Sequence, residues 1–170
     1  DILERASARE TTARVAAGAF AKMLLARLGV EIASGVVALG PIGAGRATPS
    51  WEEIRRVDDD SPLRAVDAGL EAEMVRAVDA ARTTGDTLGG AVTVIAHGVP
   101  VGLGSHVAWN EKLDGRIAQA MMSVPAVKAV EIGSPQFFDN ADRIFYGWNT
   151  PLHDARPFGK IFPYEHHRGG

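Results

Sequence analysis

Residues 113–133 constrain the fold of this chain more than any other segment, because an amphipathic helical pattern there runs into a short strand pattern. The apolar spacing predicts a helix over residues 114–124, and the run from Val127 to Ile132 predicts a strand. Two further helix and strand pairs precede this one. The expected order is therefore helix, strand, helix, strand, helix, strand, which indicates an α+β fold.

The first pair is expected at residues 8–28 and 30–39. Ser7 followed three residues later by Glu10 is the pattern of a capping box, and Gly29 provides a left-handed stop. The apolar residues that recur at spacings of three and four, and that we expect to be buried, are Val15, Ala16, Ala19, Phe20, Met23 and Leu24. β-branched residues between Val30 and Leu39 then predict a strand.

The second pair is expected at residues 67–83 and 91–96. The residues that define the helical face are Leu70, Met74, Ala77, Val78 and Ala81. Gly85 ends this helix, and the continuous apolar run from Ala91 to Ala96 predicts a buried strand. Residues 41–62, with Gly, Pro, Ser and three consecutive aspartates, predict a surface loop with one helical turn around Trp51 to Arg55.

Residues 134–170 differ in amino-acid composition from the rest of the chain. They hold most of the aromatic residues, and prolines at 135, 151, 157 and 163 interrupt any long element. We expect this tail to be extended or looped and to belong to the same domain.

Composition narrows the class of protein. With 170 residues, 46% of them hydrophobic, the chain is long enough for one domain or for a piece of a larger one. A net charge of −3 gives no reason to expect a nucleic-acid partner, and the lack of cysteine excludes disulfides and thiol catalysis. No run of eighteen apolar residues indicates a membrane span, so a cytoplasmic location is the default expectation. Because Asp1 is an unusual first residue, we interpret the chain as a fragment or a truncated homologue.

Several motifs stand in an order that resembles the chorismate synthase family. Arg5 to Thr11 reads Arg-Ala-Ser-Ala-Arg-Glu-Thr, Gly85 to Gly90 reads Gly-Asp-Thr-Leu-Gly-Gly, and Gly98 to Gly104 reads Gly-Val-Pro-Val-Gly-Leu-Gly. The segment 113–133 follows at the family's spacing. The resemblance covers residues 1–133.

The resemblance implies part of a β-α-β sandwich, in which residues 1–133 form the central portion of the domain and residues 134–170 a divergent tail. It implies elimination of phosphate from 5-enolpyruvylshikimate 3-phosphate, a small-molecule substrate, to give chorismate with reduced FMN as cofactor. It also implies a homotetramer. The alternative is a catalytically inactive scaffold or ligand-binding relic of the family.

Two segments are candidates for binding the cofactor. From the residues alone, Arg5 and Ser7 lie at a helix N-terminus, where free N–H groups favour an anion such as phosphate, although a plain capped helix is the better explanation because capping boxes are common. The resemblance assigns flavin contacts to Arg5, Ala6 and Ser7, and also to Pro125 and Ala126. Since Pro125 replaces the family's usual Asn or Gln, only a backbone contact can remain there.

The family's acid–base histidine motifs are absent, so we expect no catalytic residue, weak or absent FMN binding and no turnover by this chain alone. Asp86 is interpreted as a helix-terminus or turn residue and His97 as an edge histidine, while His106 and Trp109 are expected to pack at the surface. A last group, His153, Asp154, His166 and His167, contains metal-binding side chains, but its spacing matches no known signature and we predict no metal site.

Overall fold

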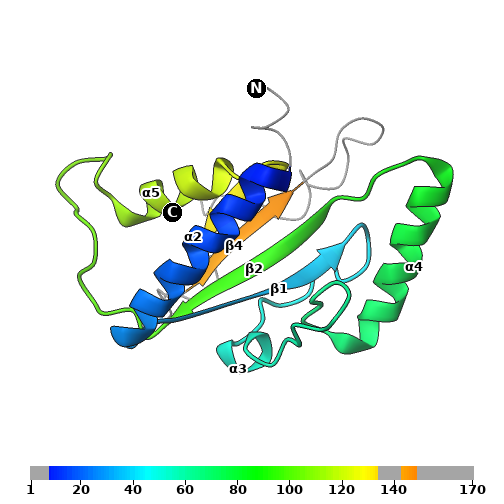
Figure 1. The fold of residues 1–170 in the computed structure, drawn as a ribbon, viewed down its shortest axis with the longest axis horizontal. Helices are drawn as coiled ribbons and strands as arrows, with labels where there is room; N and C mark the ends of the chain where they lie inside the picture. The colour runs from blue at the N-terminus through cyan, green and yellow to red at the C-terminus, as the bar shows by residue number, and fades with distance from the viewer. Residues whose placement is uncertain (1–7, 134–142, 149–170) are drawn as a thin grey trace, which may run out of the picture.

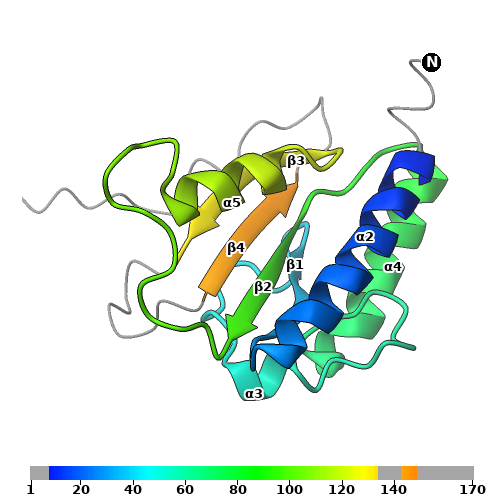
Figure 2. The same cartoon turned by 60° about the vertical axis from the view of Figure 1, so that its left-hand side comes forward.

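The computed structural model describes residues 8–133 and 143–148, which form a four-stranded antiparallel sheet with helices packed beside it. The strands are β1 (Glu31–Leu39), β2 (Gly90–His97), β3 (Val127–Ile132) and β4 (Arg143–Trp148). Their spatial order is β1-β2-β4-β3, so β4 lies between β2 and β3 (Figure 1 and Figure 2). The α+β class expected from the sequence is confirmed.

The helices are α2 (Ala8–Arg27), α3 (Trp51–Ile54), α4 (Ala68–Thr84) and α5 (Leu113–Met122). Each predicted helix is found, with its ends within two residues of the expected ones. The ends of α4 show why: the Asp67 carboxylate accepts from the Gly69 N–H at 2.8 Å, and Gly85 adopts a φ of 72° at the other end. The helical turn expected near Trp51 is α3, and Ser50 and Glu53 form a capping box at its N-terminus.

The tail contains a strand that the sequence pattern does not predict. Strand β4 pairs with β2 through Val92 and Tyr146, and with β3 through Val130 and Tyr146. Ile144, Phe145 and Tyr146 are strong strand formers, but prolines on both sides of this short run favour a loop in the sequence pattern. Residues 134–142 and 149–170 lie outside the described part of the chain.

One face of the sheet is covered by α3 and the segment that follows it. Along β2, Ala91, Thr93 and Ile95 are buried on this face. Gly35 of β1 pairs with Thr93, and a Cβ on Gly35 would come within 2.6 Å of the Val66 side chain. The segment after α3 therefore packs directly on the centre of the sheet.

Helix α4 lies beyond the end of β1 rather than over a face of the sheet (Figure 1). Its Met74 is only 1% exposed and forms a core cluster with Leu39 and Ala65. The partly buried residues packed around this cluster are Val36, Ile42, Leu63, Leu70 and Leu88. This small core anchors the loop between β1 and α4.

Helix α2 lies beside β1, but the apolar face that the sequence predicts to be buried is exposed. Val15, Phe20 and Leu24 are 67%, 74% and 63% exposed, whereas Gly18 and Leu25 are partly buried. The expectation of burial is wrong because apolar residues occur around most of the helix circumference and only one line of them meets the sheet. No helix among residues 8–133 combines the length and apolar content needed to cross a membrane.

Candidate functional site

The turn between α5 and β3 carries the second candidate segment, Pro125 and Ala126. Both residues are exposed. The Val127 N–H donates to the Val124 carbonyl at 3.2 Å, which closes the turn, and Ala126 adopts a φ of 68°. This left-handed conformation costs a residue with a Cβ about 1–2 kcal/mol. The turn therefore holds an exposed, strained backbone in a fixed shape, as functional turns often do.

The first candidate segment, Arg5, Ala6 and Ser7, lies outside the described residues, as does the serine of the expected capping box. The structure begins at Ala8, the first residue of α2. Glu10 and Arg14 stand one turn apart on this helix and form an ion pair through Glu10 Oε1 and Arg14 Nε. The first described turns of α2 thus carry a fixed guanidinium group.

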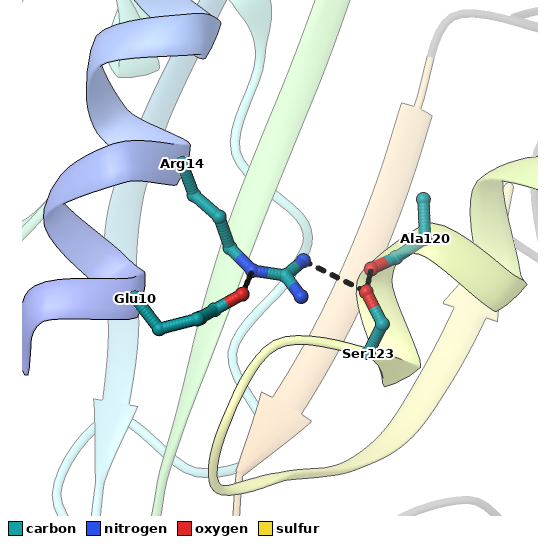
Figure 3. A network of polar contacts seen from close by, with 4 residues as sticks. All are labelled: Glu10, Arg14, Ala120 and Ser123. Carbon is teal, nitrogen blue, oxygen red and sulfur yellow. Dashed lines mark hydrogen bonds and ion pairs between the residues drawn. The ribbon is translucent and has the colours of Figure 1, made fainter. Parts of the chain in front are cut away.

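That guanidinium connects α2 to the end of α5. Arg14 Nη1 donates to Ser123 Oγ at 2.8 Å, and the Ser123 hydroxyl donates onward to the Ala120 carbonyl at 2.6 Å (Figure 3). We call the set Glu10, Arg14, Ala120 and Ser123 the α2–α5 junction. It joins residues 109 positions apart in sequence, and Ser123 stands two residues before Pro125. The start of α2 and the Pro125–Ala126 turn are therefore linked by hydrogen bonds.

Within the α2–α5 junction Glu10 is partly buried, whereas Arg14, Ala120 and Ser123 are exposed. The side chain of Glu10 is 21% exposed and that of Arg14 is 40% exposed. Glu10 Oε2 is buried and has no hydrogen-bond partner among the described residues. Arg14 is not among the sequence candidates, although its spacing of four residues from Glu10 is the signal of a helical ion pair.

The other sequence candidates lie elsewhere. Asp86 follows Gly85 at the end of α4 and its N–H donates to the Ala81 carbonyl at 2.8 Å, which confirms it as a helix-terminus residue. Its carboxylate accepts from the Thr87 N–H at 2.8 Å. His97 is an exposed residue at the end of β2, and its ring stacks on Trp51. His106 is exposed and Trp109 is 85% exposed, so the expected packing of the Trp109 ring is wrong. The group His153, Asp154, His166 and His167 lies outside the described residues.

Comparison with known proteins identifies the family. The family model described as chorismate synthase matches residues 1–142. Over 134 residues the chain is 55% identical to chorismate synthase from Solibacter usitatus, and the aligned region covers 78% of this chain and 34% of that protein. It is 55% identical over 134 residues to that of Moorella thermoacetica, which covers 79% of this chain and 34% of that protein.

A solved structure of chorismate synthase has the same fold as this chain. It superposes with a TM-score of 0.70 at 44% identity, over 78% of this chain and 42% of that chain. The chain thus spans about a third of the length of the curated relatives it matches. Because the family model matches most of its residues, the chain belongs to the chorismate synthase family.

Proposed function

We propose that the protein containing this chain is a phosphate-eliminating lyase, which converts 5-enolpyruvylshikimate 3-phosphate to chorismate in the last common step of the shikimate pathway. The observation that carries the proposal is the family match over residues 1–142, with 55% identity to chorismate synthase of Solibacter usitatus. A cytoplasmic location and assembly as a homotetramer belong to the same proposal.

This chain would contribute one wall of the site for reduced FMN, which supplies the electron-rich ring that the elimination requires. The residues proposed to contact the flavin are Arg5, Ala6, Ser7, Pro125 and Ala126. Two observations support a fit: the Pro125–Ala126 turn is exposed, and the α2–α5 junction links it to the helix that begins directly after Ser7. Pro125 has no N–H, so the turn can offer a planar ligand only its backbone carbonyls, its apolar ring and the N–H of Ala126.

The chain alone is expected to bind FMN weakly or not at all. A flavin held by part of its pocket loses contacts, and each lost charge-assisted hydrogen bond costs about 1.5–3 kcal/mol. Two such losses weaken binding by roughly a hundredfold or more, at about 1.4 kcal/mol per tenfold. Among the described histidines, His97 is stacked on Trp51 and His106 is exposed in a loop, so neither is assigned a proton-transfer role.

The alternative is a non-catalytic scaffold or ligand-binding relic of the family. Pro125 in place of Asn or Gln favours it, since the side-chain hydrogen bond to a ligand is lost there. The exposed apolar side chains of α2 would in that case serve assembly rather than catalysis. Sedimentation of the chain at micromolar concentration should then show self-association without flavin binding.

A flavin titration followed by an anaerobic assay tests the proposal. FMN fluorescence is titrated with the chain, and chorismate formation is then measured with reduced FMN and 5-enolpyruvylshikimate 3-phosphate. The same assay on the longer parent protein should give chorismate, whereas the 170-residue chain should give none. A parent that forms no chorismate would favour the scaffold. Submicromolar FMN binding by the chain would contradict the expected loss of affinity.

A further inference from the structure

The connection between α2 and the Pro125–Ala126 turn depends on one side chain. Arg14 uses Nε to hold Glu10 on its own helix and Nη1 to hold Ser123 on the other. A guanidinium is a planar group with donors at fixed angles, so the two bonds together set the direction of the side chain. Lysine could bind either partner, but it lacks this geometry.

Ser123 receives that hydrogen bond at the position where α5 ends. Its backbone N–H donates to the Gln119 and Ala120 carbonyls, and its hydroxyl donates to Ala120, so the hydroxyl is aligned to accept from Arg14. The chain then passes through Val124 and Pro125 to Ala126, where the left-handed φ of 68° reverses its direction into β3. A tether at Ser123 therefore restrains the start of the strained turn.

We propose that Arg14 is a positioning residue, which fixes the Pro125–Ala126 turn relative to the start of α2 by holding Ser123. Its function rests on the proposed flavin site, because the Pro125–Ala126 turn follows Ser123 directly and, in the sequence, Arg5 to Ser7 directly precede Ala8 of α2. Arg14 itself does not need to touch the cofactor. Its role is to hold the turn at a fixed distance from the start of α2, and Glu10 keeps the guanidinium in the required orientation.

Hydrogen exchange of the whole chain, followed by NMR, tests the restraint without any ligand. The informative amides are those of Val124 and Val127, and the reference amide is that of Ile95 in the centre of the sheet. Arg14→Gln and Ser123→Ala should each speed exchange at the turn about two- to fivefold, since a hydrogen bond to a charged group is lost at an exposed site. Exchange at Ile95 should change much less.

Matched variants separate positioning from general stability. Ser123→Thr keeps the hydroxyl and should restore slow exchange, and Lys22→Gln removes another exposed cation of α2 and should change nothing at the turn. The double variant Arg14→Gln with Ser123→Ala should exchange little faster than either single variant, because both remove the same contact. Unchanged exchange at the turn, or an equal increase at Ile95, would overturn the proposal.

A second experiment tests whether the restraint by Arg14 affects flavin binding. FMN is titrated into the unaltered chain and into Arg14→Gln, and any affinity of the unaltered chain should fall about two- to fivefold in the variant, in line with the exchange result. Equal affinities would refute a link between Arg14 and the flavin wall. If the unaltered chain binds no FMN, that result agrees with the weak or absent binding expected of the chain alone, and the exchange rates decide whether Arg14 positions the turn.

Discussion

The imidazole ring of His97 lies flat on the indole ring of Trp51, with ring centroids 4.8 Å apart and planes 9° from parallel. His97 ends β2 and Trp51 begins α3, so the stack joins the sheet to the short helix that covers it. The Arg55 guanidinium carbon lies 6.0 Å from the centre of the Trp51 ring and adds a cation–π contact. These contacts fix α3 over the end of β2.

Replacing His97 with alanine should lower the free energy of unfolding by about 0.5–1.5 kcal/mol, the usual contribution of a stacked aromatic pair beyond its burial. His97→Phe keeps a flat ring and should retain most of the stability. Urea unfolding of the three proteins measures the difference. Equal losses in the alanine and phenylalanine variants would show that stacking contributes nothing here.

Thr93→Val should stabilise the protein by about 1 kcal/mol, because an unsatisfied buried polar group costs about 1–3 kcal/mol. Thr93 is 1% exposed, and its Oγ1 has no hydrogen-bond partner among the described residues. Thr93→Ser keeps the hydroxyl but removes a buried methyl group, and should be less stable than the unaltered chain. Thermal unfolding gives both changes. A valine variant that melts lower would mean that the hydroxyl is satisfied in solution.

Glu71 should make stability depend on pH below about 4.3, the ordinary pKa of a glutamate. Hydrogen bonds from the Ser61 hydroxyl and the Leu63 N–H lower the pKa of Glu71. Since the folded pKa lies below the unfolded one, this stabilisation is fully present above the ordinary pKa and is lost as pH falls through the folded value. In Glu71→Gln the free energy of unfolding, measured with urea between pH 6 and pH 3, should therefore fall less as the pH is lowered. An unchanged pH dependence would contradict the assignment.

Replacing either of two glycines with alanine should change the stability of the protein, in opposite directions. Gly98 has a φ of 75°, and a Cβ there would collide with the Gly29 carbonyl, so Gly98→Ala should cost about 2 kcal/mol or more. Gly18 lies inside α2, and a methyl group added there would meet nothing within 4 Å, so Gly18→Ala should gain about 0.5–1 kcal/mol. Circular dichroism on heating compares them. A loss in the Gly18 variant would indicate close packing of α2 in solution.

Local signals account for what the sequence predicts correctly. Asp67 and Gly85 mark the ends of α4, and strand β3 has the predicted bounds because Val127 to Ile132 is bounded by Pro125 and Gly133. The resemblance to chorismate synthases also comes from contiguous motifs, which a single chain displays directly.

Long-range relationships account for what the sequence does not predict. The contact between Arg14 and Ser123 joins residues 109 positions apart, and no local pattern encodes it. The exposure of Phe20 depends on which side of α2 meets the sheet, and apolar residues on several sides leave that choice open. Strand β4 takes its place from partners on both sides, whereas its flanking sequence resembles a loop.

The position of β4 has a consequence for the order in which the sheet assembles. Strands β1 and β2 pair directly, but β3 has no neighbour in the described sheet other than β4. During synthesis, β3 must wait for residues 143–148 to emerge before it can join the rest. Until then β2 and β3 each present an unpaired edge, which is a hazard for aggregation. The last of these four strands to leave the ribosome is therefore the one that closes the middle of the sheet.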